Sequence, residues 1–100
     1  MARRGLLNAA LGVEIRARRE AAGLTREQVC KAADTARNVL IRLEAGTRSM
    51  TVEQLEAIAR ALETDLNDIY QGARKRIESG QIRTRSERAA DELRAAIGFD

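Results

Sequence analysis

The sequence predicts an all-α protein, and three observations carry that prediction. Its dominant apolar spacing is helical, because apolar residues recur three, four and seven positions apart. It contains no proline and seven glycines, a composition typical of helices that stop at glycine. No stretch alternates apolar and polar residues over the length that a strand needs. We therefore expect short helices joined by turns, without a sheet.

Each expected helix has a start signal, a stop signal or both. The first runs from about Asn8 to Ala22 and stops at Gly23. Capping boxes, in which a Thr is followed three residues later by Gln or Glu, open the second, fourth and last helices at Thr25, Thr51 and Thr84. The third helix covers residues 36–44 and ends before Gly46, and Asp65 caps the fifth. The residues expected to face the core are Leu11, Ile15, Ala22, Val29, Ala32, Ala33, Leu40, Leu43, Val52, Leu55, Ile58, Ala59, Leu62, Leu66, Ile69 and Tyr70.

Two regions follow from this pattern, a five-helix domain over residues 1–72 and a basic linker with an amphipathic helix over residues 73–100. Residues 71–83 could instead extend the fifth helix, with a break at Gly80. The last helix carries a narrow apolar stripe at Ala89 or Ala90, Leu93 and Ile97. This stripe could pack on the core, pair two subunits as a homodimer, or bind a small protein partner such as a toxin.

Composition excludes several classes of function. The chain has 100 residues, 18 Lys and Arg, 15 Asp and Glu, no His, one Cys and two aromatic residues. Without His there is no imidazole base and no His-ligated zinc, and one Cys cannot form an internal disulfide. Two aromatic residues are too few for stacking platforms that bind single strands or RNA. We expect no enzyme, no metal and no cofactor. No apolar run suits a membrane span or a signal peptide, which predicts a cytoplasmic protein.

The net charge of +3 is unevenly distributed. Residues 1–23 carry five positive and two negative charges, and residues 24–48 carry five and three. Residues 49–73 carry one positive and five negative charges, whereas residues 74–94 carry seven and four. Basic segments on both sides of an acidic one favour encounter with a phosphate backbone.

Residues 24–46 contain the informative motif. They predict two short helices separated by a tight turn, a helix-turn-helix whose second helix fits the major groove of B-DNA. This stretch, with its flanking residues over about residues 8–70, resembles the lambda-repressor-like family of Cro/C1-type helix-turn-helix proteins. Such proteins include phage repressors and antitoxin-like regulators.

The resemblance implies a set of DNA contacts and one structural ion pair. Arg pairs with guanine and Asn with adenine through two hydrogen bonds each, so these residue types suit base recognition. Val39 would pack on a thymine methyl, or else be partly buried. An ion pair between Arg19 and Glu44 would tie the first helix to the recognition helix. The implied base contacts are Arg37, Asn38, Val39 and Arg42, and the implied backbone contacts are Thr25, Arg26, Thr47 and Arg48.

The sequence departs from the family pattern around the turn. Asp34 stands where the family usually has Gly, and Asp tolerates the left-handed conformation. Ala36 cannot cap the recognition helix through its side chain, which leaves Thr35 or Asp34 for that role. Arg26 replaces a frequent Gln. Cys30 stands at a position that prefers Ala, and we interpret it as a small buried hydrophobe.

The chain is therefore identified as a sequence-specific regulator that binds double-stranded DNA, with a transcriptional repressor as the favoured role. Two alternatives remain open at this point. One is a DNA-binding antitoxin whose C-terminal segment holds a toxin. The other is a protein-interaction module that has lost DNA binding, although the presence of Arg37, Asn38 and Arg42 speaks against it.

Overall fold

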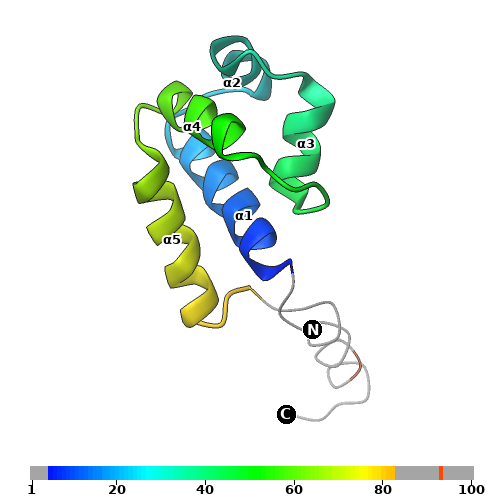
Figure 1. Cartoon of the computed structure of the whole chain (residues 1–100), viewed down its shortest axis with the longest axis vertical. Coiled ribbons are helices and arrows are strands. Elements are labelled where there is room, and N and C mark those ends of the chain that lie inside the picture. The colour runs from blue at the N-terminus through cyan, green and yellow to red at the C-terminus, as the bar shows by residue number, and fades with distance from the viewer. Residues whose placement is uncertain (1–4, 83–92, 94–100) are drawn as a thin grey trace.

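Helices make up the regular structure of the residues that the computed structural model describes, 5–82 and 93. No strand occurs among them, which confirms the all-α prediction. The predicted last helix lies outside the described residues, apart from Leu93. In chain order the helices are α1 (Leu6–Ala21), α2 (Arg26–Ala33), α3 (Arg37–Ala45), α4 (Val52–Ala61) and α5 (Leu66–Glu78) (Figure 1).

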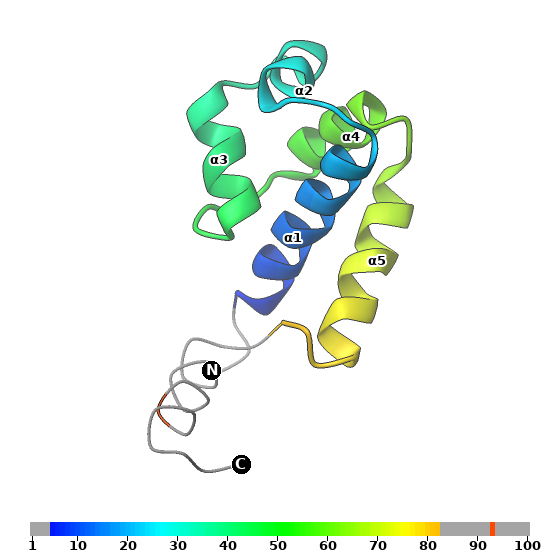
Figure 2. The same ribbon diagram turned by 180° about the vertical axis from the view of Figure 1, so that it is seen from behind.

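The first helix, α1, lies at the centre of the fold. It packs against α5 on one side and against α3 on the other, and two opposite views show it between them (Figures 1 and 2). The chain enters α1 at the end where α5 finishes, so the two helices run antiparallel. The short helices α2 and α4 pack against each other at the other end. This arrangement leaves α3 at the side of the domain opposite α5.

The predicted capping residues hold the starts of three helices. Thr25 Oγ1 accepts from the backbone N–H of Gln28 at 3.1 Å, and the backbone N–H of Thr25 donates to Gln28 Oε1 at 2.8 Å. Thr51 and Gln54 form the same box on α4, with both distances 3.0 Å. Asp65 Oδ1 accepts from the Asp68 N–H at 2.8 Å. These bonds satisfy backbone donors that a helix start otherwise leaves open.

The turn between α2 and α3 differs from the sequence-based expectation in one respect. Asp34 adopts the left-handed conformation, with φ 51°, and ends α2 as predicted. The expectation that Thr35 or Asp34 caps α3 is wrong, because Ala36 is the N-cap and no side chain of the described residues bonds to the helix start. The Thr35 hydroxyl instead turns back and donates to the Ala33 carbonyl at 3.2 Å. The start of α3 is therefore left without a side-chain partner.

The core lies where the five helices meet. Its largest fully buried side chains come from all five helices and are Ile15, Val29, Leu40, Leu43, Ile58 and Ile69. Four predicted core residues are exposed instead: Ala22, Ala32, Val52 and Tyr70.

The positions of these four residues explain the errors. Ala22 follows the last residue of α1, and Val52, which is 71% exposed, is the first residue of α4, where the neighbouring helices no longer cover the apolar stripe. Ala32 and Tyr70 lie next to the buried residues Ala33 and Ile69 in sequence, and adjacent helical positions point about 100° apart. A sequence pattern cannot fix how wide the covered stripe is.

Two helices are longer than the shortest prediction for them. α1 begins at Leu6 rather than Asn8, and Leu6 is buried. α5 runs past residue 72 and ends at Glu78, which agrees with the alternative in which residues 71–83 extend the fifth helix to a break at Gly80. Ala73 is fully buried and Ile77 packs against the core, so the stretch predicted as a linker is in part a packed helix.

A glycine at the end of α3 sets how closely that helix approaches α1. Gly46 ends α3 with φ 74°, a left-handed value that suits Gly. A β-carbon at Gly46 would lie 2.9 Å from Ala9 Cα in α1. The absent side chain therefore lets the end of α3 lie directly on α1.

Candidate nucleic-acid interface

The third helix has an inner and an outer face. Leu40 and Leu43 are fully buried, and Glu44 is buried beside them. Arg37, Asn38 and Arg42 are exposed, as is Ala45 one turn after Arg42. With 3.6 residues per turn, Asn38, Arg42 and Ala45 share the side opposite the buried residues, and Arg37 lies at its edge. The structure thus brings three of the four predicted base-contacting residues to one solvent-facing surface.

Val39 is placed differently from these three residues. It is half-buried and packs against the hydrophobic core. Ile41 is half-buried too, but it follows Arg37 and Asn38 by one turn and therefore lies beside the outer face. Ile41 and Ala45, which were not among the predicted base contacts, complete this surface in place of Val39. The signal that could have found them is their spacing of three to four residues from Asn38 and Arg42.

Glu44 joins three helices through one carboxylate. Arg19 of α1 donates to it from Nε at 2.7 Å and from Nη2 at 3.2 Å, and Arg26 of α2 donates from Nε at 3.0 Å. The Glu44 side chain is 2% exposed. Its hydrogen bonds raise the pKa of the Arg19 guanidinium above the usual value, while burial acts in the opposite direction. Arg19 and Glu44 therefore form the geometry that the family resemblance implied, with Arg26 as an additional partner.

The start of α2 borders a shallow hollow beside α3. Its lining includes Arg19, Thr25, Arg26 and Arg37, and its volume is about 400 Å³. Thr25 and Arg26 were predicted as backbone contacts and Arg37 as a base contact, so the structure brings both kinds of residue together here. Glu27 lines it as well, but the three guanidinium groups outnumber the carboxylates of Glu27 and Glu44, so the excess positive charge and the positive end of α2 give this hollow an anion-binding character.

The segment after α3 carries the other two predicted backbone contacts. Thr47 and Arg48 are both exposed. The Thr47 N–H donates to the Arg42 carbonyl at 3.0 Å, which closes the end of α3. Asn8 Nδ2 of α1 donates to Ser49 Oγ at 3.2 Å and so attaches this segment to the central helix. Arg48 is consequently exposed in an anchored turn that follows the end of α3.

A second ion cluster joins α1 to α5, away from α3. Glu14 accepts from Arg18 Nε at 2.7 Å and from Arg76 Nε at 2.8 Å. Burial would raise the pKa of Glu14, but the hydrogen bonds from Arg76 and Arg18 outweigh it and hold the pKa below its usual range. A β-carbon at Gly72 of α5 would overlap the Glu14 carboxylate. This cluster fixes how α5 lies on α1.

Cys30 behaves as a packing residue in α2. It is half-buried and packs against the hydrophobic core. Burial raises the pKa of its thiol, so little thiolate is present at neutral pH.

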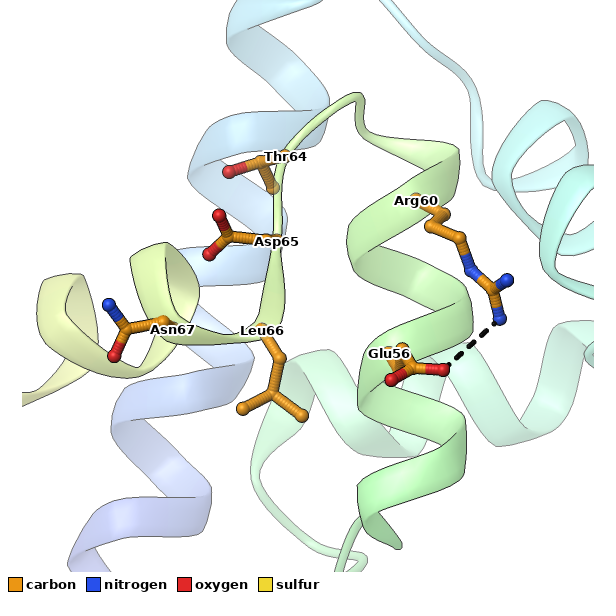
Figure 3. A pocket seen from close by; sticks show the side chains of 6 residues that line it. All are labelled: Glu56, Arg60, Thr64, Asp65, Leu66 and Asn67. Carbon is orange, nitrogen blue, oxygen red and sulfur yellow. Dashed lines mark hydrogen bonds and ion pairs between the residues drawn. The ribbon is translucent and has the colours of Figure 1, made fainter.

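Other surfaces offer less to a nucleic acid. The hollow in Figure 3 has a volume of about 460 Å³ and is lined by α4, the turn after it and the start of α5, including Glu56, Arg60 and Asp65. Its two carboxylates and the Glu56–Arg60 ion pair suit a polyanion poorly.

Within residues 5–82 and at 93, no group of His, Cys, Asp and Glu could hold a metal ion. The same part of the chain contains no helix long and apolar enough to cross a membrane.

Comparison with known proteins agrees with this geometry. The chain matches the helix-turn-helix domain family over residues 10–69. It therefore belongs to that family, which confirms the resemblance to Cro/C1-type regulators. It is a DNA-binding regulator, a class of protein that acts by binding, and it is not an enzyme.

Solved structures show similarity over most of the described chain. The structure of the clp gene regulator ClgR from C. glutamicum shares 28% identity with a TM-score of 0.66, covering 69% of this chain and 90% of that one. A second ClgR structure from the same organism shares 25% identity with a TM-score of 0.71, covering 90% and 93%. The restriction-modification controller protein C.AhdI from Aeromonas hydrophila shares the fold, at 22% identity and a TM-score of 0.60, covering 62% and 94%. No curated protein sequence gives a significant match.

Proposed function

We propose that this protein is a sequence-specific transcriptional repressor that inserts α3 into the major groove of an operator. The observation that carries the proposal is the division of α3 into a buried face and an exposed face with Arg37, Asn38 and Arg42. Arg42 and Arg37 offer forked donors to guanine O6 and N7, and Asn38 offers a donor and an acceptor to adenine. Ile41 lies beside them and can contact a thymine methyl, the role first assigned to Val39.

Backbone contacts flank this helix in the proposed complex. Thr25 and Arg26 lie at the start of α2, and Thr47 and Arg48 follow the end of α3. Phosphate contacts on both sides of a recognition helix fix its register without reading sequence. The five acidic residues of the segment 49–73 belong to α4, the turn after it and the start of α5, and Glu53 among them lines a hollow beside the turn between α2 and α3.

Selection of DNA by the protein tests the proposal most directly. The full chain is incubated with a pool of random duplexes, bound sequences are recovered over several rounds, and affinity is measured by fluorescence polarisation. We expect one enriched sequence that binds about 10³-fold or more tightly than the random pool. Equal binding of all duplexes, or no binding at physiological salt, would contradict it and favour the protein-interaction alternative.

Repression requires a separate measurement. Purified RNA polymerase transcribes a template in which the selected sequence overlaps the promoter, with and without the protein. We expect transcription to fall as the operator fills, because α3 and its phosphate contacts occupy DNA that polymerase needs. A rise in transcription would assign an activator instead. In the cell, such a repressor would be nucleoid-associated while it is bound.

We also propose that the C-terminal segment forms the interface between two copies of the chain in a homodimer. Helix-turn-helix dimers bind half-sites about one helical turn apart, so a second subunit would extend the operator. Leu93, the described residue of the predicted apolar stripe, is 63% exposed. Light scattering of the full chain against a 1–82 truncation tests this role. A dimer that survives truncation excludes the segment as its main seam, and co-purification of a small protein from the native host would favour the antitoxin alternative.

A further inference from the structure

We propose that Arg26 is a positioning residue that joins a DNA phosphate to the recognition helix through Glu44. This inference rests on the proposed function and deepens it. It changes the role of Arg26 from a simple backbone contact to a link between the backbone and α3. The link would make the placement of the base-contacting residues depend on a phosphate.

The inner end of this link is the Glu44 carboxylate. It is almost completely buried and accepts from the guanidinium groups of both Arg19 and Arg26. Arg19 alone, bonded at 2.7 and 3.2 Å, already balances its charge. Arg26 therefore brings a second positive charge to a carboxylate that does not need it for neutrality.

The outer end of the link faces the hollow between α2 and α3. Arg26 uses Nε for Glu44, and within the described chain no other acceptor meets its guanidinium. Its side chain is 32% exposed, and the hollow that it lines also contains Arg37 and Thr25. The two outer nitrogens of Arg26 are thus available to a phosphate oxygen from the solvent side. Glu27 lines the hollow too, but the guanidinium groups of Arg19, Arg26 and Arg37 outnumber the carboxylates of Glu27 and Glu44. This excess of one positive charge and the N–H groups at the start of α2 favour an anion at the same place.

The shape of the guanidinium explains why one residue can serve both ends. Its donors form a rigid planar fork, so Nε can bond to Glu44 while the outer nitrogens bond to a phosphate. A lysine has one ammonium at the end of a flexible stem and is a point charge for either partner. A phosphate bound at Arg26 would then hold Glu44, and with it the last turn of α3, in one position.

The test compares Arg26→Ala with Arg48→Ala, which removes a proposed phosphate contact without touching Glu44. Affinity for the selected operator and for random duplex is measured over a range of salt concentrations. We expect both variants to reduce the salt dependence by about one unit. Only Arg26→Ala should also reduce the ratio of operator to random affinity, by about tenfold, because misplaced α3 residues lose base contacts. Lys31→Ala, which removes an exposed charge from α2, controls for charge alone.

Arg26→Lys sharpens the result. A lysine keeps the charge but reaches only one partner at a time, so we expect it to retain either the salt dependence or the operator preference and not both. Retention of both at wild-type values would overturn the inference, as would Arg26→Ala variants that weaken all duplexes equally. Circular dichroism and thermal unfolding of each variant confirm that the fold is intact, as expected for a residue at a helix start with a third of its side chain exposed. A wild-type chain that selects no duplex would overturn the proposed function itself, and this role with it.

Discussion

Gly12 of α1 lies directly against the carbonyl oxygen of Leu43 in α3. A β-carbon at Gly12 would overlap that oxygen and would lie 2.8 Å from the carbonyl oxygen of Glu44. Gly12 is buried and lies within a helix, where glycine is otherwise unfavourable. The close approach of the two backbones is the physical reason for a glycine at this position.

We predict that Gly12→Ala destabilises the protein by about 1–3 kcal/mol, because the added methyl forces α1 and α3 apart. Helix propensity alone predicts the opposite sign, since alanine in place of glycine stabilises a helix interior by about 1 kcal/mol. Urea unfolding followed by circular dichroism distinguishes the two. A variant as stable as the parent chain, or more stable, would show that α1 and α3 do not approach this closely.

Arg42→Ala should weaken operator binding by about 1–3 kcal/mol and relax base preference at one position of the site. The reason is the loss of a forked donor from the centre of the exposed face of α3. Repeating the duplex selection with the variant measures both effects. Arg60→Ala is the matched control, because Arg60 is an exposed arginine of α4, outside the helix-turn-helix, and pairs with Glu56. Unchanged affinity and base preference for Arg42→Ala would mean that α3 is not the reading helix.

Arg48→Ala should weaken binding to all duplexes alike. Arg48 is exposed in the turn after α3, outside the helix face that we propose reads the bases. Loss of one phosphate contact makes the plot of log affinity against log salt shallower by about one unit. Titrations from low to physiological salt give this slope. A variant that changes base preference while keeping the wild-type slope would place Arg48 in the groove instead.

Acid should destabilise the fold through Glu14. Its pKa is lower in the folded chain than in the unfolded chain, so the ionised carboxylate stabilises the fold above the unfolded pKa of about 4.3. That stabilisation is lost as the pH falls through the folded pKa. We expect the urea midpoint of the parent chain to drop below about pH 4.3, and Glu14→Gln to show a smaller drop from a lower starting value.

A surface carboxylate on the same helix provides the comparison for Glu14. Glu20→Gln removes an exposed partner of Arg16, and exposed pairs contribute little to stability. Its pH profile should follow that of the parent chain. If Glu14→Gln and the parent chain run parallel between pH 3 and 7, the Glu14 cluster does not contribute to acid stability.

The local signals in the sequence predicted most of this fold. Capping boxes at Thr25 and Thr51 mark their helices correctly because the bonds involved are three residues apart and need no tertiary context. The periodic apolar residues Leu40 and Leu43 likewise orient α3 correctly. These features depend on neighbours in the chain, which a sequence displays directly.

Features that depend on other helices were left open or missed. Val39 was assigned either to a thymine methyl or to partial burial, and it is half-buried against the core, whereas Val52 was expected in the core but is exposed. The contact of Arg26 with Glu44 spans 18 residues and joins two helices, so no local sequence pattern predicts it. The pairing of Glu14 with Arg76 spans 62 residues, so it too cannot be predicted from a local sequence pattern.

The two faces of α3 consist of different residues, and this separation bears on how such a protein can diverge. Leu40, Leu43 and Glu44 hold the helix in place, whereas the side chains of Asn38, Arg42 and Ala45 are exposed and make no hydrogen bond or ion pair within residues 5–82. Substitutions on the outward set can therefore give a new operator while folding free energy stays nearly constant. A library randomised at those three positions should yield folded regulators with altered targets, which makes this small domain a scaffold that can be redesigned one surface at a time.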